Sequence, residues 1–459
     1  MRVKGLIFSV SGARGIVGQG IDAVVLTELA AHFGSWLGEG TVVVGRDSRI
    51  SGEMARGAVT AGLLGAGRDV VDLGIVPTPT VGLAVRKLGA AGGIQISASH
   101  NPAEWNALKL MSSRGIFLTA QEGANLKARI DAGRPEFVGA FDVGSRTRRQ
   151  DFPSVHVDEI LASPLVDAEA VRERGLRCVV DCVAGAGGPT ARILLERLGV
   201  KVSWLHDGPT GRFPRNPEPL PENLTELGET VREKKADIGF ALDPDADRVA
   251  VVDETGRPIG EEVTLAVVVD FVLPQVGGDV VVNVSTTMAI EAVAERHGAK
   301  VRRTPVGEVN VTEEMLRCGA RIGGEGNGGI IVPAVNPGRD GLLGIALWLT
   351  ALAKTGEKVS GLAGRIPATV MRKEKIELKG LTDDQVDQIL EDLPAGFPEA
   401  RVDRTDGLKL LTDEGWVHVR RSNTEPIVRL LAEAGTETAV DDLVRRARDL
   451  VGRSAAAGR

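Results

Sequence analysis

Three stretches of the chain show the same order of apolar and polar positions. In each, an apolar run predicts a buried strand, a turn follows, an amphipathic pattern predicts a helix, and a second apolar run predicts another strand. The stretches are residues 41–80, 177–211 and 278–310. Because strands that alternate with helices build parallel or mixed sheets, we predict three α/β domains with mixed sheets.

Downstream of each stretch, two further predicted strands flank a polar loop. The loops are SASHNP at 97–102, DPDADR at 243–248 and GEGNGG at 324–329. Chance seldom places unusual loops at matching positions three times. We therefore predict that the three domains are related and that each contributes one loop of unusual chemistry.

The C-terminal part has a different pattern, in the order strand, helix, three strands, helix. Thr382 and Gln385 have the spacing of a capping box for a helix near 382–393. The last helix is expected at about 437–451, and the tail from Ser454 to Arg459 is expected to fray. Its predicted apolar face consists of Val440, Leu443, Val444 and Leu450.

We therefore predict four domains, with a smaller α+β domain at the C-terminus. The expected limits are 1–152, 153–256, 257–366 and 367–459. The charged segment 143–153 and the loop 253–260 are the predicted connections between the first three domains.

Composition narrows the class of protein. A chain of 459 residues, of which 43% are hydrophobic, is too long for one core. The net charge of −7 and the lack of a long basic block argue against nucleic acid as a partner. No apolar run is long enough for a membrane span, and the first residues do not resemble a secretory signal.

The cysteines indicate a reducing compartment, so we expect a cytoplasmic protein. Cys178 and Cys182 fall in one predicted strand, roughly 13 Å apart, which is too far for a disulfide. Only Cys318 remains, and no histidine pair flanks it, so a zinc site is not expected.

The first polar loop offers a candidate nucleophile. The strand predicted over 94–96 delivers Ser99 into the turn Ser-His-Asn-Pro, and Lys109 returns on the next apolar run. Proline fixes its own φ and keeps the residue before it out of the helical region. A serine in such a turn can carry a phosphoryl group if a cation faces it, although a plain turn serine is the alternative.

The second loop offers a candidate metal site. Asp243, Asp245 and Asp247 alternate in DPDAD, and three carboxylates this close repel each other unless a divalent cation joins them. Hard oxygen ligands suit Mg²⁺. A solvated turn and a glycosyltransferase-type DxD remain alternatives. An EF-hand does not fit, because Arg248 stands where that loop requires glycine.

Three further segments carry polar groups suited to a sugar phosphate. Glu325 and Asn327 lie among glycines, where the backbone can approach a polar ligand. The RRSNT hairpin, with Arg429 on the next strand, offers the donors of a phosphate cradle. Arg14, between the glycines of SGARG, offers a further cation. Each segment alone is equally consistent with an ordinary turn.

The motifs ASHNP, DPDADR and RRSNTEP, in order with SGARG and GEGNGG, resemble the α-D-phosphohexomutase family over essentially the whole chain. The resemblance implies three α/β domains and a smaller fourth domain around a central cleft. It also implies that phosphate is carried on Ser99, and that Mg²⁺ is held by this phosphoserine with Asp243, Asp245 and Asp247.

The resemblance assigns the remaining site residues as well. Arg14 and Arg248 match arginines near the transferred phosphoryl group, and His100 and Lys109 match residues for proton transfer and phosphate contact. The residues expected to bind substrate are Gly307, Glu325, Asn327, Arg421, Ser422, Asn423, Thr424 and Arg429.

The activity implied by the resemblance interconverts hexose 6-phosphate and hexose 1-phosphate. The phosphoserine gives its phosphoryl group to the sugar phosphate, a 1,6-bisphosphate turns around, and the serine recovers the other phosphate. A hexose 1,6-bisphosphate would serve as activator, with a small sugar phosphate as the partner. The chain would be a monomer or a homodimer.

Departures from the family pattern bear on the substrate. The opening motif is FSVSGARG rather than FGTSGIRG-like, and Ser97 stands where threonine is usual. Asn327-Gly328-Gly329 replaces the common Ser-Gly-His. GEGNGG with TPVGEVNV at 304–311 is similar to members assigned as phosphoglucosamine mutases. We therefore expect glucosamine phosphate, with mannose or glucose phosphate as the alternative.

Two other classes of protein are alternatives to a mutase. A Mg²⁺ phosphatase or a nucleotide-sugar transferase could use DPDAD, but a plain hydrolase needs no phosphate clamp in a fourth domain. A catalytically silent sugar-phosphate sensor would be expected to have lost Ser99 or one of the aspartates, and this chain keeps them all.

Overall fold

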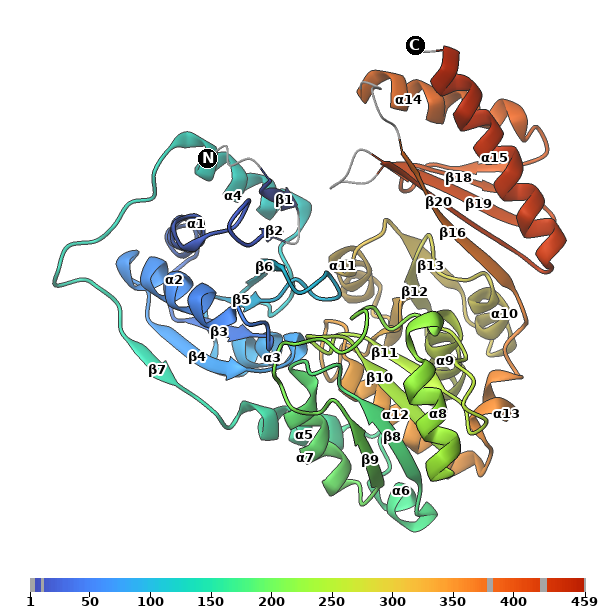
Figure 1. The fold of residues 1–459 in the computed structure, drawn as a ribbon, viewed down its shortest axis with the longest axis horizontal. Coiled ribbons are helices and arrows are strands. Elements are labelled where there is room, and N and C mark those ends of the chain that lie inside the picture. Colours follow the sequence, from blue (N-terminus) through green and yellow to red (C-terminus); the bar gives the residue numbers. More distant parts are fainter. Residues whose placement is uncertain (1–4, 10–11, 378–382, 422–426, 458–459) are drawn as a thin grey trace.

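Four β-sheets follow one another along the chain in the computed structural model (Figure 1). The structure describes residues 5–9, 12–377, 383–421 and 427–457. The N-terminus belongs to the first sheet's domain, and the C-terminus belongs to the fourth, which projects at the opposite upper side of the view (Figure 1).

The first sheet has seven strands in the order β1-β2-β6-β5-β3-β4-β7. Its strands are β1 Ile7–Ser9, β2 Gly12–Ile16, β3 Val42–Arg46, β4 Val70–Ile75, β5 Gly92–Ile96, β6 Trp105–Ser112 and β7 Arg146–Arg148. The helices of this part are α1 Ala23–Trp36, α2 Gly52–Gly65, α3 Thr78–Leu88 and α4 Ala120–Ala132.

The second and third sheets have four strands each, in the orders β11-β10-β8-β9 and β13-β12-β14-β15. The second contains β8 Arg177–Asp181, β9 Lys201–Leu205, β10 Ile238–Leu242 and β11 Val249–Val252, with α5 Phe152–Ala162, α6 Ala168–Arg174, α7 Gly187–Arg197, the 3₁₀-helix η1 Pro221–Asn223 and α8 Thr225–Lys234. The third contains β12 Val280–Asn283, β13 Val301–Thr304, β14 Ile322–Glu325 and β15 Gly329–Ile331, with α9 Glu261–Val276, α10 Ala289–Arg296, α11 Glu308–Cys318, α12 Gly341–Thr355 and α13 Val359–Ala363.

One topology recurs in the first three sheets. In β3-α2-β4-α3-β5-β6, the first strand pairs in parallel with the second and third, and the last strand returns antiparallel to the third. The units β8 to β11 and β12 to β15 repeat this pairing. The predicted recurrence is therefore confirmed, and the three polar loops occupy the same turn between the third and last strands of each unit.

The fourth sheet is antiparallel, in the order β16-β20-β19-β18-β17. Its elements are β16 Val370–Glu377, α14 Asp383–Asp392, the 3₁₀-helix η2 Leu393–Gly396, β17 Arg401–Asp403, β18 Leu408–Leu411, β19 Gly415–Arg421, β20 Ile427–Ala434 and α15 Glu437–Ala457.

Several local predictions for this domain need correction. Four strands, not three, lie between its helices, because the short β17 pairs with β18. Helix α15 continues to Ala457 instead of fraying from Ser454. Val451 is fully buried in the core, whereas Leu450 is only partly buried beside it. The predicted cap Thr382 lies outside the described residues.

Two predictions nearer the N-terminus also need correction. The segment 143–153, predicted as a connection, adds the edge strand β7 to the first sheet by pairing with β4. Cys182 follows the end of β8 instead of lying within the strand, although both it and Cys178 are buried free thiols. The limits at 152, 256 and 366 fall between successive sheets, and their exact positions stay predictions.

The hydrophobic cores show which parts of the chain are joined. One continuous core includes Leu194 and Phe240 of the second domain together with Val282 and Leu343 of the third. The buried helix α12 lies in this shared core and packs on α6, α7 and α9. The fourth domain has a core of its own, whereas the first has one core of its own and a second that also includes Phe152 of α5 and Val309 of α11. The second and third domains therefore form one packed body.

A buried polar junction connects the first domain to this body. His156, in α5, has Thr80 Oγ1 at 2.9 Å from Nδ1 and Asp340 Oδ2 at 2.7 Å from Nε2. Thr80 lies in α3, and Asp340 caps α12 by accepting from the N–H groups of Leu342 and Leu343. The junction therefore fixes α3, α5 and α12 at one point.

In the part of the chain that the structure describes, no helix combines the length and the apolar character needed to cross a bilayer.

We expect Asp340→Ala to destabilise the fold by about 2–4 kcal/mol. The substitution removes a helix cap and leaves a buried His156 nitrogen without its partner, and these losses add. Chemical denaturation measures the change. As a control, Asp22→Ala removes the exposed cap of α1, in which Asp22 accepts from the Val25 N–H, and it should cost about 1 kcal/mol. Equal losses in the two variants would contradict the buried junction.

Candidate functional site

The backbone around Ser99 turns sharply at the end of β5. Ser99 has a φ of +49°, in the left-handed region that most side chains avoid, and it is 7% exposed. Its N–H donates to the Ser97 hydroxyl at 2.9 Å, and Ser97 in turn donates to Asp47. The hydroxyl at 97, where threonine is usual, therefore keeps a structural role in this loop.

Arg49 holds the same loop in place through hydrogen bonds to its backbone. This guanidinium is 1% exposed and donates to the carbonyl oxygens of Ser99, Asn101, Pro102 and Trp105 over 2.6–3.0 Å. Asp47 neutralises it at 3.0 Å. Hydrogen bonds from one rigid guanidinium group to four carbonyl oxygens fix the path of the Ser99 loop.

The aspartate loop follows β10 in the second domain. Asp243, Asp245 and Asp247 are fully buried, and one carboxylate oxygen from each lies within 4.8 Å of the others. Thr78, at the start of α3, donates its N–H to the Asp245 carbonyl and its hydroxyl to the Asp245 side chain. The first domain therefore forms direct hydrogen bonds to the aspartate loop.

The serine and the aspartates meet at the boundary between the first two domains. Ser99 Oγ donates to Asp243 Oδ2 at 2.7 Å, although 144 residues separate them. Lys109 Nζ, from β6, donates to Asp245 Oδ2 at 2.6 Å and to Asp247 Oδ2 at 3.2 Å. The structure therefore brings the candidate nucleophile, a cation and the acidic cluster together.

Burial and charge set the protonation of this cluster. Burial raises the pKa of Asp243 well above its usual range, and the charges of Asp247 and Asp245 raise it further. Burial alone would raise the pKa of Asp247, but Arg339 and Lys109 hold it below its usual range. Burial alone would lower the pKa of Lys109, but Asp245 and Asp247 raise it.

The residues present fit a divalent metal ion. Among the described residues, the Oδ1 atoms of Asp245 and Asp247 are buried and have no hydrogen-bond partner. Such acceptors are costly unless a cation or donor satisfies them. The donors are all carboxylate oxygens, which suits Mg²⁺ rather than a softer metal.

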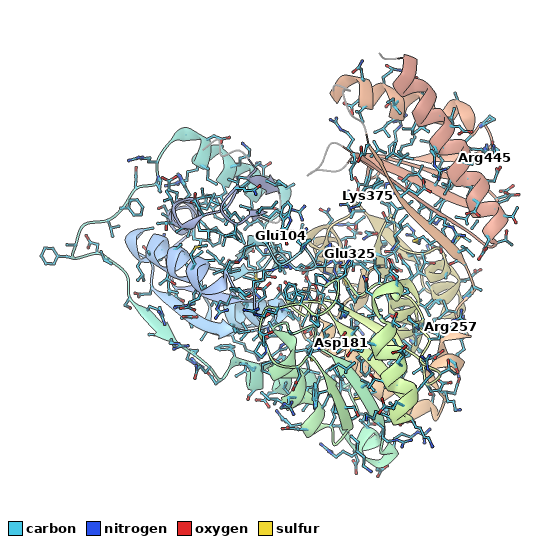
Figure 2. The ribbon with its side chains drawn as sticks, in the orientation of Figure 1. Glu104, Asp181, Arg257, Glu325, Lys375 and Arg445 are labelled. Atoms are coloured by element: carbon cyan, nitrogen blue, oxygen red, sulfur yellow. The ribbon has the colours of Figure 1, made fainter. Side chains whose placement is uncertain are left out.

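The third loop places its glutamate against this cluster. Glu325 ends β14 and is 3% exposed; its Oε1 accepts from Asn283 Nδ2 at 2.8 Å and from the Gly307 N–H at 3.1 Å. Asn327 is half-buried and accepts from the Gly329 N–H within its own loop. Figure 2 shows Glu325 near the middle of the molecule. Gly307, Glu325 and Asn327 are thus close together.

The remaining predicted residues of the first two domains line the same region. Arg14 lies on β2, two positions from Gly12, which is paired with Lys109, so both basic side chains leave one face of the sheet. Arg248 Nε is 3.7 Å from Asp247 Oδ1. His100 Nδ1 is 3.5 Å from Ser99 Oγ, and burial, aided by Arg248, lowers its pKa well below the usual range.

The fourth domain separates the two arginines predicted for the phosphate cradle. Arg421 Nη1 donates to Asp387 of α14 at 3.0 Å, on the face that the helix covers. Arg429 is paired with Arg420 and with Lys375 across neighbouring strands, so these three cations share a face. Ser422, Asn423 and Thr424 lie outside the described residues.

The three clustered cations favour an anion at this face. Like charges directly opposite each other destabilise a sheet. Within the described chain, the Nε atoms of Arg420 and Arg429 are buried and lack a hydrogen-bond partner. Burial lowers the pKa of Arg420, and the negative charge of Glu325 in the third domain acts in the opposite direction. A phosphate would satisfy these donors.

The fourth domain rests on the loop that follows β12. His418 Nδ1 lies 3.0 Å from Ser285 Oγ, Lys409 Nζ donates to the Val284 carbonyl at 2.6 Å, and Glu433 accepts from the Met288 N–H at 2.7 Å. Asn283, which donates to Glu325, is the last residue of β12 and immediately precedes this loop. The residues that contact the fourth domain and the residue that holds Glu325 are therefore adjacent in the chain.

Sequence reasoning missed several residues of the site. They are Arg49, Thr78, Asn283, Glu308, Arg339, Lys375 and Arg420. A charged residue among glycines or turn residues was the available signal for Arg49 in GRDSR and for Arg339 in GRDG. Nothing in the local pattern marks Thr78 or Asn283, whose roles depend on contacts with distant segments.

Comparison with known proteins agrees with this geometry. Four domain families match in order: the phosphoglucomutase/phosphomannomutase α/β/α domains I, II and III at residues 5–136, 154–256 and 261–370, and the C-terminal domain at 370–450.

Relatives and solved structures match over nearly the full length. A phosphoglucomutase/phosphomannomutase of Thermococcus kodakarensis is 39% identical, covering 94% of this chain and 95% of its own. A probable phosphoglucosamine mutase of Methanopyrus kandleri is 37% identical, covering 98% of each chain. The crystal structure of a family protein from Burkholderia thailandensis superposes with a TM-score of 0.85 at 29% identity, covering 98% of this chain and 97% of that one.

Matched over all four domains, and with an acidic cluster and a serine at the junction of the first two, the chain belongs to the phosphoglucomutase/phosphomannomutase family, the α-D-phosphohexomutases, and is a phosphohexomutase, an isomerase.

Proposed function

We propose that the protein interconverts hexose 6-phosphate and hexose 1-phosphate through a phosphoserine at position 99 and a 1,6-bisphosphate intermediate. The observation that carries this proposal is the 2.7 Å contact between Ser99 Oγ and Asp243 Oδ2. It places a hydroxyl from one domain within a buried acidic cluster of another. A serine used only to shape a turn would not need that neighbour.

The proposed transfer exchanges one phosphate ester for another. The bond between phosphorus and Ser99 Oγ breaks while a bond forms between phosphorus and the free hydroxyl oxygen of the sugar phosphate. The sugar hydroxyl loses its proton as the new bond forms, and Ser99 Oγ gains one as it leaves, so one proton moves from the sugar oxygen to Ser99. His100 Nδ1, which lies 3.5 Å from Ser99 Oγ, is the group proposed to move it, with Lys109, which contacts the acidic cluster, as the alternative. After the bisphosphate turns around, Ser99 attacks its other phosphate and the isomer is released.

Charge neutralisation supports the transfer. Lys109 and Arg248 contact the aspartates, and Arg14 leaves the same face of the sheet as Lys109, so these cations are proposed to stabilise the negative charge that develops on the oxygens of the transferred group. Mg²⁺ held by Asp243, Asp245 and Asp247 would supply further Lewis-acid stabilisation when bound. Five buried carboxylates, including Glu308 and Glu325, explain why the chain needs this much positive charge.

The other phosphate of the substrate would bind the cation face of the fourth domain. Arg420, Arg429 and Lys375 provide the donors there, and the hairpin residues Ser422, Asn423 and Thr424, predicted from the sequence, are proposed to complete the cradle. One cradle must accept either end of the bisphosphate, which a domain with its own core can do by moving as a unit.

Glucosamine phosphate is the proposed substrate, with mannose or glucose phosphate as the alternative. The support is the loop GEGNGG together with the segment 304–311, and the names of several curated relatives. Another relative is named for glucose and mannose phosphates.

We expect Ser99→Ala to lower turnover by about a thousandfold or more, because the phosphoryl carrier is lost. Steady-state assay and circular dichroism test activity and fold together. Peptide mass spectrometry after incubation with glucose 1,6-bisphosphate should find phosphate on Ser99 of the unaltered protein. Ser112→Ala, a buried serine on β6, should stay active. Full activity of Ser99→Ala would exclude the phosphoserine route.

Mg²⁺ should stabilise the folded protein, by about 2.7 kcal/mol at one hundred times its dissociation constant. The bound ion would relieve repulsion among the three buried aspartates. Thermal unfolding with and without EDTA measures this shift, and it should vanish in Asp245→Asn. Asp253→Asn, which alters a buried carboxylate that caps a turn at the opposite end of β11, should keep it. A shift that persists in Asp245→Asn would place the metal elsewhere.

Glucosamine 6-phosphate should give the highest kcat/KM of the three hexose phosphates. A coupled assay with a trace of bisphosphate compares glucosamine, mannose and glucose 6-phosphates under equal conditions. Asn327→Ser, which restores the usual family residue, should change the ratio among the sugars while Ser99 phosphorylation is unchanged. A higher kcat/KM for mannose or glucose phosphate would reject the proposed substrate but not the mutase.

A further inference from the structure

Arg339 lies between the aspartate loop, residues 243–248, and the third loop, residues 324–329, which we call the sugar loop. It contacts both loops. Its side chain is 8% exposed. Nη2 donates to Asp247 Oδ2 at 2.7 Å, and Nη1 donates to Glu325 Oε2 at 2.6 Å. Nε lies 3.0 Å from Glu308 Oε2, so one guanidinium is paired with three carboxylates from separate segments.

The backbone of Arg339 is fixed against the aspartate loop. The next residue, Asp340, caps α12 and is held by His156. Gly341 donates its N–H to the Ala246 carbonyl at 3.1 Å, and Ala246 lies between Asp245 and Asp247. The guanidinium therefore extends from a rigid helix start instead of a free loop.

The sugar loop leaves room for the stem of this arginine. A Cβ at Gly329 would lie 2.1 Å from Cδ and 2.9 Å from Cγ of Arg339. The backbone at Gly329 is not in the left-handed region, so space alone demands glycine there. Gly329 and Arg339 are a matched pair, and any side chain at 329 must displace the arginine.

Arg339 determines how Glu325 presents its carboxylate. Oε1 is held by Asn283 and Gly307, and Oε2 is held by Arg339, so the group cannot rotate. Oε1 accepts two hydrogen bonds and Oε2 accepts one, so Oε2 keeps a lone pair for a sugar hydroxyl. Burial would raise the pKa of Glu325, but chiefly Arg339 lowers it, so the carboxylate is ionised and accepts only.

We propose that Arg339 is a positioning residue of the transfer reaction, which holds the Glu325 carboxylate in its sugar-binding orientation at a fixed spacing from the aspartate loop. This inference rests on the proposed function, since it takes Glu325 as the residue that seats the sugar and Ser99 as the phosphoryl carrier. A hexose bound to Glu325 then has its free hydroxyl at a set place relative to Ser99.

The two contacts of Arg339 predict effects of opposite sign. Without Arg339, Glu325 is free to turn, and sugar-phosphate binding weakens. Without Arg339, Asp247 also loses a competing cation, and Mg²⁺ binds as tightly as before or more tightly. A residue that only maintained the fold would weaken both kinds of binding.

The first test compares Arg339→Gln and Arg339→Lys with the unaltered protein. We expect the KM for the hexose phosphate to rise ~10- to 100-fold, as for the loss of a hydrogen bond between charged groups, with a smaller change in kcat. Lysine keeps the charge, and so supports folding if glutamine does not, but it cannot span three carboxylates. Calorimetric titration with Mg²⁺ alone should show a dissociation constant that is unchanged or lower.

A double-mutant cycle with Glu325→Gln tests whether Arg339 acts through Glu325. Arg339→Gln should add little to the KM of a protein that already carries Glu325→Gln. A second cycle uses the matched pair: Gly329→Ala should raise KM when Arg339 is present and have little further effect with Arg339→Ala. In the Gly329→Ala variant the guanidinium charge of Arg339 is still present, so this second cycle tests the position of the guanidinium and not its charge.

Additive effects in the first cycle, or an unchanged KM in Arg339→Lys, would overturn the inference. Weaker Mg²⁺ binding together with an unchanged KM would assign Arg339 to the metal loop alone and also overturn it. The proposed function fails by a different result, which is activity in Ser99→Ala. If Ser99→Ala is inactive and the Arg339 cycles are additive, only the inference about Arg339 is rejected.

Discussion

The site depends on the burial of three aspartates that lie within 4.8 Å of one another. Carboxylates removed from water repel each other strongly, and their own domain supplies Arg248, 3.7 Å from Asp247. Lys109 comes from the first domain and Arg339 from the third. The aspartate loop is therefore stable only where three domains meet, and this electrostatic demand places the site at their junction.

The repeated topology explains why three loops can meet there at all. In each of the first three domains the loop follows the third strand of the unit, at the carboxyl end where parallel strands direct their turns to one edge. The shared core around α12 fixes the second and third domains to each other. The junction of Thr80, His156 and Asp340 then fixes α3 of the first domain to both.

The fourth domain is joined differently. It has a separate core, and its polar contacts with the third domain include those of His418, Lys409 and Glu433 to residues 284–288. Such an interface can be remade at lower cost than an apolar one. Asn283, which supports Glu325, immediately precedes the same segment, so the fourth domain and Glu325 are both supported by this part of the third domain.

The sequence by itself determined the three repeated units, the smaller fourth domain and the position of a polar loop after the third strand of each unit. Apolar periodicity and adjacent residues such as DPDAD are local, so they can be seen without a fold. The extent of α15 and the edge strand β7 were missed, because pairing and packing with distant segments decide them. Only the tertiary structure showed that Ser99 bonds Asp243 and that Arg421 and Arg429 leave opposite faces of their sheet. It alone showed that Arg339 joins two loops, because contacts between residues 14 to 144 positions apart exist only once the domains have packed.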